Sequence, residues 1–173
     1  MTTDQLKALV RDVPDFPEAG IIFKDLMPLI GNAAAFHSTV EHLAEWTRPR
    51  NPDVILGAEA RGFIFGGALA YELGCGFVPA RKPGKLPWEK VRATYDLEYG
   101  SDSLEIHADA LAPGSRVIVL DDVLATGGTA RAKVDLVERL GGEVVGALFV
   151  IELTFLDGRA KLDGTDVHAL IAY

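Results

Sequence analysis

The chain of 173 residues has little of several things that would define its class. Its single cysteine, Cys75, excludes an internal disulfide and any cysteine-rich metal site. The formal net charge of −8 argues against binding to nucleic acid or an anionic membrane, because both reward a basic face. No apolar run approaches the roughly 18 residues of a membrane span, and the N-terminal residues show no signal-peptide core. We therefore expect a cytoplasmic protein that binds neither nucleic acid nor membrane.

Two common phosphate-binding signatures are also missing. The sequence contains no Gly-Lys-Ser/Thr, which removes the lysine and the metal-binding hydroxyl of a P-loop nucleotide hydrolase. It contains no G-x-G-x-x-G between a strand and a helix, so the dinucleotide-binding fingerprint is absent as well. A nucleotide hydrolase and a nicotinamide or flavin enzyme are therefore disfavoured.

What the chain does have is a regular alternation of strand-like and helix-like segments. Apolar residues make up 49% of the sequence, enough for one domain with a substantial core. Helical patterns over 62–73 and 129–140 stand between apolar strand-like runs, and the first of them ends at Gly74. Such alternation predicts an α/β fold with a mainly parallel central sheet flanked by helices on both faces. Nearer the N-terminus, Thr2 with Gln5 suggests a capping box and Asn32 a helix cap.

The stretch RVIVLDDVLATGGTARAKV, residues 116–134, carries the chemistry. Residues 117–120 are a continuous apolar run, typical of a strand buried on both faces of a parallel sheet. Asp121 and Asp122 follow at its carboxyl end, where open α/β sheets bind ligands. The residues 126–129, Thr-Gly-Gly-Thr, offer backbone N–H groups and a helix N-terminus, with Thr129 as the expected N-cap, and so predict a phosphate site.

Two carboxylates next to a phosphate site suggest one kind of ligand. Carboxylates accept hydrogen bonds, and the vicinal hydroxyls of a ribose 5-phosphate donate a pair of them close to a phosphate. We therefore expect Asp121 and Asp122 to meet the 2- and 3-hydroxyls while the loop holds the 5-phosphate. These residues alone leave a second interpretation open, a glycine-rich turn with helix-capping acids, because turns use the same residue types.

The residues VIVLDDVLATGGTA, 117–130, resemble the phosphoribosyl-pyrophosphate signature of the type I phosphoribosyltransferases. The blocks DFPEAGIIFKD (15–25), GAEARGFIFG (57–66), RKPGKLP (81–87) and YDLEYG (95–100) are similar to those of the adenine-specific members, in the same order. The resemblance implies a single domain over 1–173, with a small N-terminal hood contributed by about 1–31 and a flexible catalytic loop. It also implies transfer of the phosphoribosyl group of 5-phosphoribosyl 1-pyrophosphate (PRPP) to adenine, which gives AMP and pyrophosphate.

The same resemblance implies roles for individual residues at the phosphate end. Arg61 and the backbone at Ala60, in EARG (59–62), would hold the leaving pyrophosphate; from the sequence alone, Arg61 could equally be a solvated arginine at a helix start. Asp121 and Asp122 would bind the ribose hydroxyls. The 5-phosphate would lie in a cradle formed by Ala125, Thr126, Gly127, Gly128 and Thr129.

At the base, Phe23 would stack on adenine while the backbone of Ile22 and Lys24 reads its edge; an aromatic in an apolar run is otherwise more often core. Glu98, in YDLEYG, would take the proton that the imidazole ring loses when N9 attacks the sugar, and Tyr99 would position the loop. Glu105 is a rival carboxylate nearby.

Three further expectations complete the prediction. Arg81 and Lys85 resemble a basic segment that reaches the pyrophosphate of a neighbouring subunit, which implies a homodimer. The negative charge of the departing pyrophosphate calls for Mg²⁺, which we expect to be bound mainly through the substrate. The four histidines lack the spacing of metal ligands, so no metal site formed by the protein is expected.

Two alternative functions stay open at this point. One is a transferase for guanine, hypoxanthine or xanthine. The other is a non-catalytic regulator that senses a purine or PRPP, although the chain has no spare residues for the DNA-binding element of such a regulator.

Overall fold

A computed structural model describes residues 1–96 and 101–173 of the chain. It divides into two compact units, Met1–His42 and Leu43–Tyr173, which are described separately below. In the described ranges, no helix has both the length and the apolar character needed to cross a membrane.

The N-terminal unit contains a two-stranded antiparallel sheet and short helices. Its elements are α1 (Thr3–Lys7), β1 (Arg11–Pro14), β2 (Ile22–Asp25), α2 (Met27–Ile30) and the first part of α3 (Ala33–Thr47). Two predicted caps are confirmed. The capping box at Thr2 has both of its hydrogen bonds, and the Asn32 side chain accepts the Ala35 N–H at 3.0 Å.

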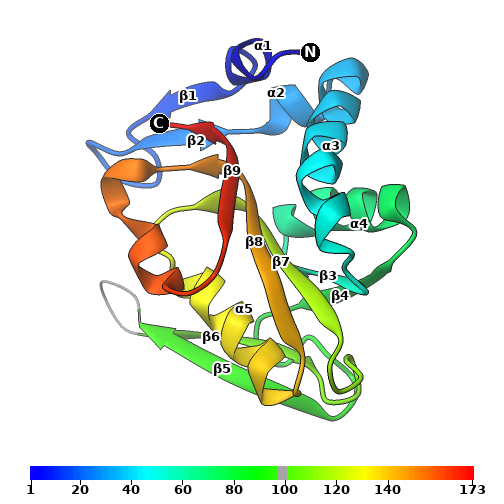
Figure 1. Cartoon of the computed structure of the whole chain (residues 1–173). Coiled ribbons are helices and arrows are strands. Elements are labelled where there is room, and N and C mark those ends of the chain that lie inside the picture. Colours follow the sequence, from blue (N-terminus) through cyan, green and yellow to red (C-terminus); the bar gives the residue numbers. More distant parts are fainter. Residues whose placement is uncertain (97–100) are drawn as a thin grey trace. The chain divides into compact units, whose positions relative to one another are not determined.

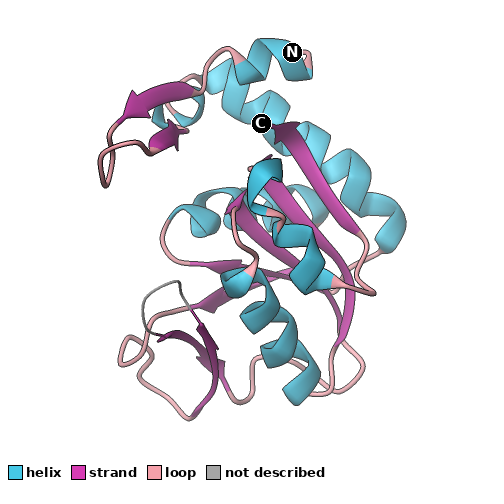
Figure 2. Ribbon diagram, turned by 90° about the vertical axis from the view of Figure 1, so that its left-hand side faces the viewer, coloured by secondary structure: helices cyan, strands magenta, loops and turns pink. Residues whose placement is uncertain are grey.

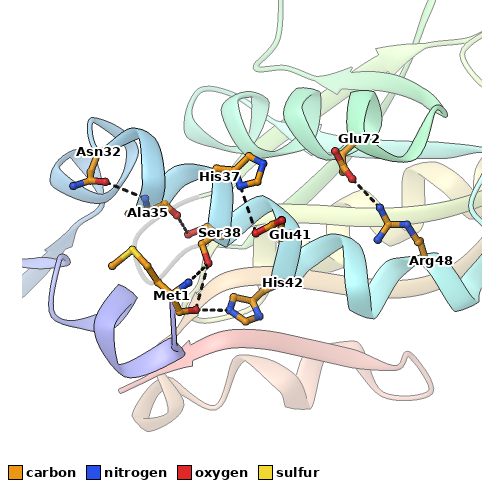
Figure 3. A network of polar contacts seen from close by, with 10 residues as sticks. Met1, Asn32, Ala35, His37, Ser38, Glu41, His42, Arg48 and Glu72 are labelled. Atoms are coloured by element: carbon orange, nitrogen blue, oxygen red, sulfur yellow. Dashed lines mark hydrogen bonds and ion pairs between the residues drawn. The ribbon is translucent and has the colours of Figure 1, made fainter.

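The first residue of the chain is fixed to α3 by polar contacts. The Met1 ammonium donates to Ser38 Oγ at 2.8 Å, and His42 Nε2 lies 2.9 Å from the Met1 carbonyl oxygen (Figure 3). Ser38 is buried away from water, so these contacts supply the hydrogen bonds that water would make to its hydroxyl.

The second unit is built on a five-stranded sheet in which every pairing is parallel (Figures 1 and 2). The spatial order is β4-β3-β7-β8-β9. The strands are β3 (Val54–Ala58), β4 (Gly76–Ala80), β7 (Arg116–Leu124), β8 (Glu143–Glu152) and β9 (Val167–Ala172). The predicted α/β fold with a parallel central sheet is confirmed.

The strand order places the two main helices on opposite faces of this sheet. From β3 the chain passes through α4 (Arg61–Leu73) to β4 on one side, and from β7 through α5 (Gly128–Arg139) to β8 on the other. Right-handed crossovers in opposite directions put α4 and α5 on opposite faces, as Figure 1 shows. From β3 and from β7 the chain therefore moves along the sheet in opposite directions, and the carboxyl ends of these two strands form a topological switch point.

Close packing holds both helices to the sheet. On the α4 side, a Cβ at Gly66 would lie 2.6 Å from the Phe77 ring, so only glycine allows this approach. On the α5 side, Phe149 and Val119 of the sheet pack with Val137 of the helix in one buried cluster. α4 ends as predicted at Gly74, which has a φ of +69°.

A hairpin and short 3₁₀ segments complete the second unit. β5 (Lys90–Asp96) pairs antiparallel with β6 (Ser101–His107). The 3₁₀ turns are η1 (Arg48–Arg50), η2 (Thr154–Leu156) and η3 (Gly158–Leu162).

Two local boundaries differ from the sequence prediction. β7 does not end before the acidic pair; it continues to Leu124, with Asp121 in register with Phe149 of β8. Thr129 is not the N-cap of α5, because Gly127 takes that position with a φ of +80° and the helix begins at Gly128. A left-handed glycine turns the chain into the helix two residues earlier than a threonine cap would.

Candidate active site

The loop after β7 packs tightly against the backbone of Gly158. A Cβ at Gly127 would lie 2.3 Å from the Gly158 carbonyl oxygen, and its φ is positive, so both packing and conformation require glycine there. Gly158 begins η3, which packs against this loop. The N-terminus of α5 follows directly, and Thr126 is exposed beside it. Backbone N–H groups at a helix N-terminus make an anion site.

The acidic pair lies in the last part of β7 and is almost completely buried. Asp121 is 8% exposed and Asp122 is 6% exposed. Asp121 Oδ2 accepts a hydrogen bond from Lys133 Nζ at 2.7 Å, and Asp121 Oδ1 accepts the Asp122 N–H at 3.1 Å. Burial raises the pKa of Asp121 above its ordinary value, the Lys133 ammonium opposes that rise, and the Asp122 carboxylate adds to it.

The loop after β3 reaches the same switch point. Residues Glu59 and Ala60 connect β3 to α4 through a cis peptide bond, and Arg61 is the first residue of the helix. Arg61 Nε donates to Asp122 Oδ2, and the two side chains form an ion pair across 61 positions of sequence. The predicted pyrophosphate loop and the predicted ribose acids are therefore in direct contact.

Glu59 ties this loop to the basic segment 81–85. Its Oε1 accepts the Lys82 N–H at 2.6 Å, and its Oε2 accepts a hydrogen bond from the Arg81 guanidinium at 3.1 Å. Burial raises the pKa of Glu59, but these two donors outweigh it and hold the pKa below its ordinary value. The Arg81 guanidinium thus contacts the predicted pyrophosphate loop of its own chain, whereas Lys85 is exposed.

Lys82 connects the basic segment to the β5–β6 hairpin. Its Nζ donates to Asp102 and, at 3.0 Å, to the Tyr95 hydroxyl; these two residues face each other across the hairpin. Asp102 accordingly has a lowered pKa, caused first by the Lys82 hydrogen bond. Glu98 and Tyr99, the predicted catalytic-loop residues, lie outside the described residues.

Glu105, the rival carboxylate, is enclosed within the protein. It is 1% exposed; its Oε1 accepts two hydrogen bonds from Arg92, at 2.9 and 2.6 Å, and its Oε2 accepts the Gly84 N–H at 3.1 Å. Burial raises the pKa of Glu105, but the Arg92 and Gly84 hydrogen bonds lower it below its ordinary value. These contacts give Glu105 a structural role in holding the basic segment to β6.

The N-terminal unit carries the predicted base-binding residues on β2. The Phe23 ring lies edge-on to Phe16, with ring centroids 5.2 Å apart, and both line a hollow of about 200 Å³ together with Val13 and Asp25. Lys24 Nζ binds Asp12 at 2.6 Å, so its side chain is held on the hairpin. The sequence reasoning named Phe23 but not the other three lining residues. The pairing of β1 with β2, which sets Val13 opposite Phe23, brings them together.

Sequence reasoning also missed two residues beside the acidic pair. Lys133 lies on the buried face of α5 together with Ala130, Val134 and Val137. A lysine at a position where the helical period predicts an apolar residue could have been recognised from the sequence as unusual. Gly62 lies so close to Asp121 that a Cβ there would be 2.8 Å from Asp121 Oδ1. Nothing in the sequence pattern indicates that contact.

Side chains that commonly bind metals are dispersed over the described part of the chain. Across residues 1–96 and 101–173 no group of three or more histidine, cysteine, aspartate or glutamate side chains could hold an ion. Asp121 and Asp122 are already bound to Lys133 and Arg61. Both carboxylates are therefore engaged by cations of the chain itself.

Comparison with known proteins agrees with this arrangement. The phosphoribosyl transferase domain family matches residues 30–168. The adenine phosphoribosyltransferase of Thermoanaerobacter sp. (strain X514) is 55% identical over 173 residues, all of both chains. The crystal structure of the enzyme of that name from Thermoanaerobacter pseudethanolicus superposes with a TM-score of 0.97 at 55% identity, covering 99% of this chain and 100% of that one.

A more distant relative is known with ligands bound. The adenine phosphoribosyltransferase of Saccharomyces cerevisiae, complexed with an imino-altritol bisphosphate and adenine, has a TM-score of 0.92 at 45% identity over 97% of each chain. Taken with the phosphate loop, the acidic pair and Arg61 at one switch point, these likenesses place the chain among the adenine phosphoribosyltransferases, the adenine-salvage members of the phosphoribosyl transferase family.

Proposed function

We propose that this chain transfers the phosphoribosyl group of PRPP to adenine and so makes AMP and pyrophosphate. The contact between Arg61 and Asp122 carries the proposal, because it joins a loop suited to pyrophosphate with the acids and phosphate loop suited to ribose 5-phosphate. The names of the full-length relatives support adenine as the acceptor, and the yeast relative was crystallised with adenine.

In this proposal the second unit holds PRPP. The loop Ala125–Thr126–Gly127 and the first residues of α5, Gly128 and Thr129, bind the 5-phosphate through backbone N–H groups and the helix N-terminus. Asp121 and Asp122 accept hydrogen bonds from the ribose hydroxyls. Ala60 and Arg61 bind the pyrophosphate, where the guanidinium offsets the charge that grows as the leaving group departs.

The N-terminal unit handles the base. Phe23 stacks on adenine in the hollow that it lines with Val13, Phe16 and Asp25, and the backbone of Ile22 and Lys24 reads the edge of the base. Adenine presents both a donor amine and an acceptor ring nitrogen along that edge, which matches the alternating carbonyl and N–H groups of a strand.

Glu98 takes the proton in the bond-forming step. N9 of adenine forms a bond to C1 of the ribose while the bond from C1 to the pyrophosphate oxygen breaks, and the imidazole proton passes to the Glu98 carboxylate. Tyr99 helps to position the same loop. Glu105 does not compete for this role, because both of its oxygens are occupied by Arg92 and Gly84 in the interior.

Mg²⁺ and a second subunit complete the proposed enzyme. When bound through the oxygens of PRPP, Mg²⁺ offsets the negative charge of the departing pyrophosphate. Arg81 and Lys85 belong to a segment that serves the site of a neighbouring subunit in a cytoplasmic homodimer. Analytical ultracentrifugation tests the dimer: a fully active species sedimenting as the 173-residue monomer would exclude it.

The test of the function is a comparison of initial rates. The purified chain is given PRPP and Mg²⁺ with adenine, guanine, hypoxanthine or xanthine in turn, and each nucleotide product is measured by chromatography. We expect AMP from adenine at a rate far above that of any other product. Faster turnover of another purine would reassign the base, and PRPP binding without any turnover would favour the sensing regulator.

A further inference from the structure

Lys133 is a buried cation without a part in the function proposed above. It projects from the second turn of α5, its side chain is 0% exposed, and its ammonium donates to the Leu120 carbonyl oxygen and to Asp121 Oδ2, each at 2.7 Å. The Phe149 ring of β8 lies 5.9 Å from Nζ. A fully buried lysine is rare and is retained only where it is paired.

Asp121, its partner, is held from three sides. Lys133 of α5 contacts Oδ2, the Asp122 N–H of the same strand contacts Oδ1, and the backbone of Gly62 in the first turn of α4 packs against Oδ1. A carboxylate has about four acceptor positions, so two remain after these hydrogen bonds. The Asp121 side chain keeps 12% of its surface exposed, which leaves it accessible to one small group.

Lys133 favours the ionised form of Asp121 against the burial and the charge around it. Burial raises the pKa of Asp121, and the Asp122 carboxylate, itself paired with Arg61 of α4, acts in the same direction. Lys133 opposes both effects at hydrogen-bond distance. Without its ammonium, the Asp121 carboxyl would protonate at a higher pH and become a weaker acceptor.

We propose that Lys133 is a positioning residue for PRPP: it fixes the ionised Asp121 carboxylate between the starts of α4 and α5, with its remaining acceptor positions directed to a ribose hydroxyl. Lys133 itself touches no substrate and acts only through Asp121. The inference rests on the proposed function for the identity of the ligand.

The experiment compares Lys133→Met, Asp121→Asn and the double variant with the wild type. Methionine approximates the length of the lysine stem without its charge. Lys161→Met is the control, because it removes the same charge from an exposed position in η3. The readouts are the Kd of PRPP with Mg²⁺, measured by calorimetry at pH 6, 7, 8 and 9, the KM of adenine, and the Tm.

We expect Lys133→Met to weaken PRPP binding at pH 7 by about 10- to 100-fold, which is typical of a lost charge-assisted hydrogen bond. The KM of adenine should change by less than about twofold, since the base is handled by the other unit. The Kd of Lys133→Met divided by the wild-type Kd should fall as the pH rises, because a larger share of the Asp121 carboxyl is then ionised without help from the ammonium. In the double variant, which lacks that carboxyl, the Kd divided by the wild-type Kd should not change with pH.

The proposal is overturned if Lys133→Met lowers the Tm but leaves the PRPP Kd and its pH dependence as in wild type, or if PRPP and adenine weaken equally. Should Lys133→Met not fold, Asp121→Asn is compared with the double variant. With no carboxylate left to hold, removing Lys133 must then weaken PRPP binding by no more than about twofold, and a further tenfold loss rejects the idea. Because PRPP binding is measured directly, a wild type that binds PRPP but makes no AMP would refute the proposed function and not this role of Lys133.

Discussion

Glu105→Gln separates the structural carboxylate from the proposed catalytic one. The substitution keeps the size of a side chain that is 1% exposed and removes its charge. Glutamine keeps only one acceptor oxygen, and its NH₂ group then faces either Arg92 or the Gly84 N–H, both of which are donors. One of the two contacts is therefore lost.

The size of the effect follows from the exposure of the partners. Breaking a buried ion pair costs about 3–5 kcal/mol when the remaining charge is stranded. The Arg92 side chain is 54% exposed, so water can solvate its guanidinium after the substitution. The expected loss is therefore nearer that of a hydrogen bond to a charged group, about 2 kcal/mol in the free energy of unfolding. For a chain of this length, that corresponds to a Tm lower by about 4–8 °C.

The loss should also depend on pH in a defined direction. Arg92 and Gly84 hold the pKa of Glu105 below its ordinary value of 4.5, so the folded protein binds a proton there less readily than the unfolded chain. The stabilisation is then complete above pH 4.5 and is lost as the pH falls through the folded pKa. The difference in unfolding free energy between wild type and Glu105→Gln should be largest near pH 7 and should shrink below pH 4.5.

The assay pairs urea unfolding with single-turnover AMP formation, using Glu98→Gln as the matched variant. Glu105→Gln should unfold at lower urea concentration yet keep its single-turnover rate within about threefold at saturating substrates. Glu98→Gln should keep the wild-type stability and lose about 10²- to 10⁴-fold in rate, the usual contribution of a placed proton acceptor. If Glu105→Gln is the variant that loses turnover, or if Glu98→Gln reacts at nearly the wild-type rate, the assignment of the proton acceptor is wrong.

Three further predictions concern the phosphate end. Gly127→Ala should destabilise the fold and abolish PRPP binding. Gly114 has the same φ of +80° but no atom within 4 Å of an added Cβ, so Gly114→Ala should lose only about 1–2 kcal/mol of unfolding free energy to backbone strain. Equal losses for the two variants in urea unfolding would contradict the packing argument. Asp122→Asn should weaken PRPP binding by about 10- to 100-fold in calorimetry while the adenine KM stays constant, and an unchanged Kd would remove Asp122 from the ribose site. Chelation with EDTA should stop AMP formation and added Mg²⁺ should restore it; full activity in EDTA would exclude the metal.

The sequence determined the parts of this protein that depend on local pattern. The apolar run 117–120 predicts a buried parallel strand, the alternation of segments predicts the α/β fold, and Gly74 marks a helix end, all confirmed in the structure. The acidic pair and the Thr-Gly-Gly-Thr loop are adjacent in the chain, so their chemistry could be recognised before their geometry was known. The family assignment, which the comparisons confirm, depended on these same contiguous residues.

Tertiary structure alone decided which distant residues meet. The contact of Arg61 with Asp122 exists because β3 and β7 are neighbours at the point where the strand order reverses, and no local periodicity encodes that order. The partner of Lys133 likewise follows from how α5 packs on β7. The burial of Glu105 against Arg92 also follows from the pairing of β5 with β6, which sets these two residues opposite each other. Helical and strand periods determine which face of an element is buried, whereas the packing of whole elements determines what lies against that face.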